Sequence, residues 1–309
     1  MKLNLVLGTA LLVGLVLVGY RPKAVPPNPT NYSKIDSDAD LPLAMPDESI
    51  RPLRSLVDST LQKRLFRKMK ANPKWAQLIK EKRLAVGLVN LRDPYQVKYA
   101  SVNGNEMMYA ASLPKIAILL AAMDALEKRE LEESTVILND LDAMICRSDN
   151  QASTRMIDRL GYDKIEKVLT DPRYEFYDED YGGGLWVGKR YAASGERHPD
   201  PIKGLSHAAT VSQVCRFYYL LSMGQLVNFE RSKQMLNIMD DPALHHKFVY
   251  TLDRIAPDAR VFRKSGSWRD YHSDSVLVWG KDPRRRYILV ALTQDPDGER
   301  IIRELVGTA

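Results

Sequence analysis

The sequence has little cysteine, no internal repeat and only a small excess of positive charge. Its two cysteines, Cys146 and Cys215, fall in segments with helical periodicity. They either pair in an oxidising compartment or remain as buried free thiols. The net charge is +6, and the basic residues are scattered along the chain. Basic clusters that lack a nucleic-acid-binding motif are usually solvent-exposed surfaces. We therefore expect no nucleic-acid partner.

The sequence also lacks a recognisable metal-binding pattern. His245 and His246 are adjacent, so their side chains point apart on a helix. The acids of YDEDYGGG, residues 177–184, do not have the spacing of a calcium loop. We expect no metal and no other cofactor.

Long apolar runs are absent except at the N-terminus. Residues 1–20, MKLNLVLGTALLVGLVLVGY, contain one lysine and no further charge. This run indicates either a cleaved signal peptide or a short membrane anchor. Residues 21–50 are rich in proline and polar residues and are typical of a tether. We therefore expect export to the periplasm or cell envelope, secreted or membrane-anchored, with the folded domain over residues 51–309.

The order of secondary structure predicts two lobes. Apolar periodicity indicates an N-terminal helix, a β-hairpin over 84–91 and 96–102, and then helices from Ser112 that include one over 151–169. A loop region follows over 170–207, and strands return near residues 258–264, 273–280 and 285–294. Five strands closing into one mostly antiparallel sheet form the simplest fold. The sheet lobe would then comprise residues 51–111 and 226–309, and an all-helical lobe would comprise residues 112–225.

Three short motifs supply candidate chemistry. Ser112-Leu113-Pro114-Lys115 begins an apolar helix, which places a lysine about one turn from a serine. A serine becomes nucleophilic when a base takes its proton, and a lysine can be that base if burial lowers its pKa to roughly 7–8. The alternative, purely structural interpretation is a helix-capping serine with a solvent-exposed lysine.

The two other motifs also have ordinary structural interpretations. Ser148-Asp149-Asn150 precedes the expected helix over 151–169, and all three residue types cap helices. Lys264-Ser265-Gly266 lies on or beside the first late strand, where it could be a solvated strand end with a glycine bulge. It is the combination of the three motifs, in this order, that favours a catalytic site.

In that order, S-x-x-K, S-D-N and K-[ST]-G resemble the penicillin-recognising serine acyltransferases. The helical block between an early hairpin and three late strands resembles the class A β-lactamase fold in particular. SDNQASTRMIDRLG (148–161) resembles the helix that follows S-D-N in this family, and RKSGSW (263–268) resembles part of its late strand pair. The resemblance covers about residues 51–309. It implies an α/β two-lobe fold, with a five-stranded, mostly antiparallel sheet flanked by helices and an all-helical lobe.

The resemblance implies four catalytic residues. Ser112 would be the acylated nucleophile, and Lys115 would be its base or proton relay. Ser148 would pass a proton to the leaving nitrogen, and Lys264 would tune the electrostatics of the cleft.

It also implies a substrate-binding set. Asn150 would hold the side-chain amide of the substrate, and Ser265, followed by Gly266, would bind its carboxylate. The backbone N–H groups of Ser112 and Ser267 would form the oxyanion hole, in which one donor is worth roughly 3–4 kcal/mol of barrier.

One departure concerns deacylation. Class A β-lactamases carry a glutamate in an E-x-x-L-N loop that activates the deacylating water, and the corresponding stretch here has no such motif. Glu175, Glu179 and Glu196 are acids in the right region, but each also suits the surface. The aromatic residues of the same stretch, Tyr181, Trp186 and Tyr191, could line a cleft or pack the loop. The interval from Ser112 to Ser148 is also short for a class A enzyme.

These observations predict an exported serine hydrolase or acyltransferase that forms an acyl-enzyme on Ser112 with a β-lactam or related amide. The first alternative is a D,D-peptidase-like or esterase activity without efficient β-lactam turnover. The second is a ligand-binding protein on a retired enzyme fold. We expect a monomer whose partner is a small or peptidoglycan-like acyl substrate, with membrane anchoring through residues 1–20 if that run is not cleaved.

Overall fold

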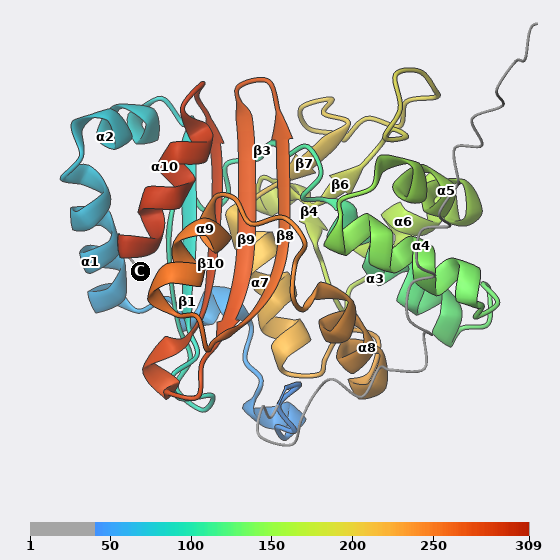
Figure 1. Cartoon of the computed structure of the whole chain (residues 1–309), viewed down its shortest axis with the longest axis horizontal. Coiled ribbons are helices and arrows are strands. Elements are labelled where there is room, and N and C mark those ends of the chain that lie inside the picture. The colour runs from blue at the N-terminus through green and yellow to red at the C-terminus, as the bar shows by residue number, and fades with distance from the viewer. Residues whose placement is uncertain (1–40, 309) are drawn as a thin grey trace, which may run out of the picture.

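The computed structural model describes residues 41–308, in which a main sheet has helices on both faces and a helical block lies at one side (Figure 1). The predictions for residues 1–20 and for most of the tether lie outside the described residues. Packed structure is already present at Leu41, within the segment predicted as a tether. The side chains of Leu41 and Leu43 are buried in the core, and the Leu43 N–H donates to the Ser222 carbonyl at 2.7 Å.

The sheet has five strands in the order β2-β1-β10-β9-β8, and all neighbours are antiparallel. This arrangement confirms the predicted five-stranded antiparallel sheet. Its strands are β1 (Leu84–Asn90), β2 (Lys98–Val102), β8 (Arg260–Trp268), β9 (Tyr271–Trp279) and β10 (Arg286–Gln294).

Each face of the sheet belongs to a separate apolar cluster. On β1, Leu84, Val86 and Leu88 face one cluster, while Ala85 and Val89 face the other, as the two-residue period of a strand requires. One face is covered by α1 (Ser59–Lys70), α2 (Pro73–Lys80), α9 (Phe248–Ile255) and α10 (Gly298–Leu305). The other face packs against α7 (Val211–Ser222), which crosses β1, β9 and β10.

The helical block is built around one helix that is buried on nearly every side. That helix is α3 (Lys115–Glu127), and its residues from Lys115 to Leu126 are all buried. Its neighbours are α4 (Thr135–Cys146), α5 (Asn150–Leu160), α6 (Tyr162–Leu169) and α8 (Phe229–Met239). The single helix predicted over 151–169 is therefore wrong. Gly161, with φ of 76°, ends α5 before α6 begins.

The region predicted as a loop over 170–207 contains short strands. In one three-stranded sheet, β7 (His207–Ala209) lies between β3 (Met108–Tyr109) and β6 (Trp186–Val187). A second small sheet joins β4 (Tyr177–Asp178) to β5 (Gly183–Gly184). Two-residue strands form too short a pattern for a sequence to reveal.

Both cysteines are free thiols, with Cys215 buried and Cys146 partly exposed. Of the helices within residues 41–308, none has the length and apolarity needed to cross a membrane.

Candidate active site

Ser112 lies in a tight turn between β3 and α3. The Leu113 N–H donates to the Ala110 carbonyl at 3.1 Å, and the Lys115 N–H donates to the Ser112 carbonyl at 3.3 Å. The residue at the N-cap position is Pro114, and no side chain caps the helix. The interpretation of Ser112 as a capping serine is therefore wrong, and its hydroxyl is not used to begin the helix.

Lys115 is a buried lysine at the start of α3. Its Nζ donates to the Ser148 carbonyl at 2.7 Å and to Asn150 Oδ1 at 2.8 Å. Burial lowers the pKa of Lys115 to about 7, although the negative charge of Asp149 partly opposes this shift. Near neutral pH the lysine is therefore available in the uncharged form that a general base requires.

The Ser148-Asp149-Asn150 segment both caps α5 and contacts the lysines. Asp149 Oδ1 accepts from the Ala152 N–H at 2.7 Å, which is an N-cap. Ser148 has φ of 57°, and its Oγ lies 2.8 Å from Lys264 Nζ and 3.4 Å from Lys115 Nζ. The capping and catalytic interpretations of this motif are thus compatible, because different residues serve each.

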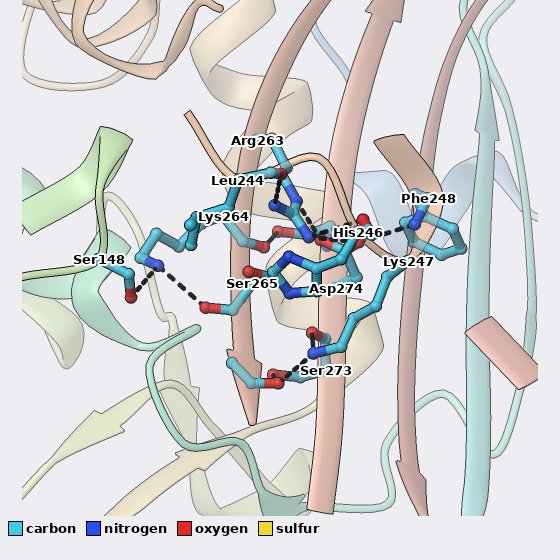
Figure 2. Close-up of polar contacts among 12 residues, drawn as sticks. Ser148, Leu244, His246, Lys247, Phe248, Arg263, Lys264, Ser265, Ser273 and Asp274 are labelled. Carbon is cyan, nitrogen blue, oxygen red and sulfur yellow. Dashed lines mark hydrogen bonds and ion pairs between the residues drawn. The ribbon is translucent and has the colours of Figure 1, made fainter. Parts of the chain in front are cut away.

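Lys264 reaches the site from β8. Its Nζ donates to Ser148 Oγ and, at 2.9 Å, to the Ser265 carbonyl (Figure 2). Burial, together with the nearby charge of Lys115, lowers the pKa of Lys264 well below its ordinary value. Lys264 and Ser265 are both buried, so this motif is not a solvated strand end.

Gly266 brings β8 against the turn that carries Ser112. A Cβ atom added at Gly266 would lie 2.3 Å from the Ala110 carbonyl oxygen and 2.6 Å from the Ser112 amide nitrogen. On the paired strand, the Ser273 hydroxyl donates to the Ala110 carbonyl at 2.7 Å. Only a residue without a side chain allows the strand and the turn to approach this closely.

Lys247, which no sequence motif marks, lies behind the same strand. Its Nζ donates to the Gly266 carbonyl at 2.5 Å, to Ser267 Oγ at 2.8 Å and to the Ser273 carbonyl at 3.1 Å (Figure 2). Burial lowers the pKa of Lys247 to about 8. Only its position in the fold identifies this residue as part of the site.

A buried ion pair holds the segment that carries Lys247. Arg263 Nε donates to Asp274 Oδ1 at 2.8 Å, and the same guanidinium donates to the Leu244 carbonyl at 2.5 Å (Figure 2). Asp274 in turn accepts from the Phe248 N–H at 3.0 Å. The pair thereby joins β8, β9 and the start of α9.

Tyr191 occupies the other side of Lys115. The Lys115 Nζ lies 4.5 Å from the centre of the Tyr191 ring, and the Tyr191 hydroxyl donates to the Ala111 carbonyl at 3.2 Å. Of the three aromatic residues singled out in the sequence, Tyr191 thus belongs to the cleft, whereas Trp186 is buried and Tyr181 is exposed beside Arg54.

The three acids considered for deacylation lie elsewhere. Glu175 faces Arg54 at 4.0 Å, Glu179 begins a short 3-10 helix, and Glu196 is exposed. Among the described residues, no hydrogen bond or ion pair joins these acids to Ser112, Lys115 or Ser148. An aromatic ring, rather than a carboxylate, therefore faces the lysine.

The histidine pair is also accounted for by local contacts. His245 Nδ1 lies 2.7 Å from Asp253, and the carbonyl of His246 accepts from Arg263 at 3.2 Å. Within residues 41–308, no group of three His, Cys, Asp or Glu side chains could hold a metal ion.

In this site Ser148 lies between two buried lysines, Lys115 and Lys264. Beside them lie the partly exposed Ser112, in the turn before α3, and the strand that contains Gly266. The Beta-lactamase enzyme family (Beta-lactamase2) matches residues 134–309. The chain belongs to this family. No curated protein matches it.

Solved structures of similar fold include beta-lactamases and a protein named PBP-A. PBP-A superposes with a TM-score of 0.57 at 19% identity, over 81% of this chain and 94% of that one. The beta-lactamase from Chitinophaga pinensis DSM 2588 has a TM-score of 0.59 at 13% identity, over 79% and 97%. The beta-lactamase from Sphaerobacter thermophilus DSM 20745 has a TM-score of 0.56 at 16% identity, over 73% and 91%. At these identities the likeness shows the fold, and it confirms the predicted two-lobe architecture.

Proposed function

We propose that the protein is a serine hydrolase or acyltransferase that forms an acyl-enzyme on Ser112 with a β-lactam or a related amide. The observation that carries the proposal is the convergence of the three motifs. Lys115 and Lys264 both reach Ser148, and Gly266 packs against the Ser112 amide.

In the proposed acylation, neutral Lys115 takes the proton of the Ser112 hydroxyl while Oγ attacks the carbonyl carbon. The negative charge that develops on the carbonyl oxygen is stabilised by the N–H groups of Ser112 and Ser267. Ser148 donates its proton to the leaving nitrogen as the C–N bond breaks, and the proton held by Lys115 replaces it through their contact. The products are a Ser112 ester and an amine, which stays attached to the acyl group when the substrate is a β-lactam.

Substrate binding is assigned to the residues around this turn. Asn150 and Ser265 would bind the amide and the carboxylate of the substrate, as the family resemblance implies. Lys247 is a further source of positive charge behind Gly266 and Ser267, and its three hydrogen bonds hold the strand that carries the second oxyanion donor.

The position of Tyr191 favours slow hydrolysis of the acyl group from Ser112. The centre of its ring lies 4.5 Å from Lys115 Nζ, and a neutral phenol ring, unlike a carboxylate, supplies no strong general base for hydrolysis of the ester. This observation supports the D,D-peptidase-like alternative, in which the acyl-enzyme is long-lived or is transferred to an acceptor. A point mutant of PBP-A, similar in fold to this chain, was solved as an acyl-enzyme complex with penicillin G. We further propose that the protein acts after export, on account of the apolar run at residues 1–20.

The proposal is tested by intact mass spectrometry of the full chain incubated with benzylpenicillin. We expect one added penicillin on the wild-type chain and none on Ser112→Ala. An adduct that survives Ser112→Ala, or no adduct on the wild type, would contradict the proposal. Binding without an adduct would instead support a retired enzyme fold, and rapid nitrocefin turnover would show that deacylation is efficient.

A further inference from the structure

A cavity of about 670 Å³ opens directly beside the proposed active site. One wall is the segment after β6, from Lys189 to Arg197, and another is the β8–β9 hairpin with Trp268 and Tyr271. Asn150 and Tyr191 line the cavity and also contact Lys115. Since Asn150 is the residue assigned to the substrate's side-chain amide, the cavity lies where the acyl side of a substrate would extend.

The charged side chains that line this cavity are all basic. Lys189 and Arg197 pair in an antiparallel bridge, which places their side chains on the same face of the segment. Lys189 Nζ donates to the Ala193 carbonyl at 3.2 Å, and Arg197 Nη2 donates to the Gly204 carbonyl at 3.5 Å. Neither cation has a carboxylate partner among the described residues, whereas the neighbouring Arg190 pairs with Asp158 at 2.6 Å.

The remaining lining adds no negative charge. None of the described residues that line the cavity is an aspartate or glutamate. His207 also lines the cavity, and burial lowers the pKa of His207 to about 4, so this ring is neutral at pH 7. Its Nε2 donates to the Lys189 carbonyl at 3.0 Å and thereby fixes the backbone from which Lys189 extends.

The wall formed by the β8–β9 hairpin is aromatic. Trp268 is 56% exposed, an unusual state for so large a side chain. Tyr271 packs edge-on against Tyr109, with ring centres 5.4 Å apart. A flat apolar group can therefore lie on this wall while an attached anion faces Lys189 and Arg197.

We propose that this cavity selects acyl donors whose acyl side chain combines a flat apolar group with a negative charge such as a carboxylate. This inference rests on the proposed function, because it assigns the cavity to the acyl side of that reaction. Lys189 and Arg197 are the specificity-determining residues, and Trp268 and Tyr271 form the apolar wall.

Three penicillins that share a phenyl side chain test the charge preference. Benzylpenicillin has no charge on that side chain, carbenicillin adds a carboxylate, and ampicillin adds an ammonium group. Dissociation constants are measured calorimetrically on full-chain Ser112→Ala, which does not require acylation. We expect carbenicillin to bind about threefold to tenfold more tightly than benzylpenicillin, the scale of solvent-facing ion pairs, and ampicillin to bind more weakly. The preference should shrink as salt is raised.

Matched double variants in the same Ser112→Ala background identify the cations responsible. Lys189→Gln with Arg197→Gln should bring carbenicillin and benzylpenicillin within about twofold, since the attraction at short range is lost. Arg67→Gln with Lys80→Gln removes the same charge from α1 and α2, outside the cavity lining, and should leave the preference intact.

Equal affinities for the three penicillins, no binding of any of them, or an unchanged preference in the Lys189 and Arg197 variant would overturn the inference. The adduct experiment on the wild-type chain is scored separately. A charge preference without a Ser112 adduct would uphold the cavity and contradict the acyl-enzyme, and an adduct without a charge preference would do the reverse.

Discussion

Lys115 is a fully buried lysine whose ammonium form is disfavoured by its surroundings. The lowering of its pKa from 10.5 to about 7 makes that form roughly 5 kcal/mol less favourable than in water. Asp149 acts in the opposite direction, because its negative charge stabilises the ammonium. The two effects together place the lysine near the balance between proton acceptor and proton donor.

Asp149→Asn should therefore shift the pH dependence of acylation. The acylation rate should rise with pH through about 7 in the wild type, as Lys115 loses its proton. Without the charge of Asp149, the pKa of Lys115 falls further and the rising limb moves to lower pH. Asparagine also caps helices, so α5 should be retained. Acylation by a fluorescent penicillin, followed from about pH 5 to about pH 9 to span the lysine titration, measures the shift, and an unmoved or alkaline-shifted limb would contradict this assignment.

Tyr191 is the residue at which hydrolysis could be introduced. Tyr191→Glu would put a carboxylate on the segment that faces Lys115, where it could activate a water for attack on the ester. We expect the lifetime of the Ser112 acyl-enzyme to shorten by about tenfold or more, the lower range of general-base effects.

Tyr191→Gln is the matched control, since it has the same shape as glutamate and lacks the basic oxygen. Decay of the adduct is followed by mass spectrometry after excess penicillin is removed. Similar lifetimes in the two variants would mean that loss of the ring, and not the new carboxylate, governs deacylation.

Strand β8 and the turn before α3 lie in close contact at Gly266. Gly266→Ala would place a methyl group within 2.6 Å of the Ser112 nitrogen, so strand and turn must separate. We expect a loss of about 1–3 kcal/mol in the free energy of unfolding, as for overpacked cores, together with a large loss of acylation. Gly307→Ala is the control, because nothing lies within 4 Å of its added Cβ. Equal stability and acylation in the two variants would contradict the close approach.

Local patterns predicted the long elements of this fold and missed the short ones. The apolar runs in β1 and the three late strands led to a correct sheet, because each run is long enough to stand out from the turns beside it. The break at Gly161 was missed, since the apolar pattern continues from α5 into α6. Strands β3 to β7 are held by pairing with other segments of the fold. Their two or three residues are too few to show a strand pattern in the sequence.

The whole molecule brings the site together across long separations in sequence. Ser148 and Lys264 are joined by one hydrogen bond, although 116 positions separate them. The motif residues themselves were predictable because three independent patterns agreed. Lys247, Tyr191 and the buried pair of Arg263 and Asp274 were not, because their roles depend on which segments the fold places side by side.

Asp274→Asn tests the contribution of that buried pair. Both side chains are at most 2% exposed, so the substitution leaves the Arg263 guanidinium buried without its counter-charge. We expect the free energy of unfolding to fall by about 3–5 kcal/mol, measured by urea denaturation near neutral pH. Asp282→Asn, which removes an exposed partner of Arg284, should leave the stability unchanged. A similar small effect of both variants would contradict a structural role for the buried pair.

The position of the acyl group on the chain decides whether Ser112 is the nucleophile. After incubation with benzylpenicillin, the full chain is digested and the modified peptide is sequenced by tandem mass spectrometry. We expect a single penicilloyl group on Ser112, within the peptide that contains Lys115. A penicilloyl group on Ser148, Lys115 or any residue outside the turn before α3 would contradict it.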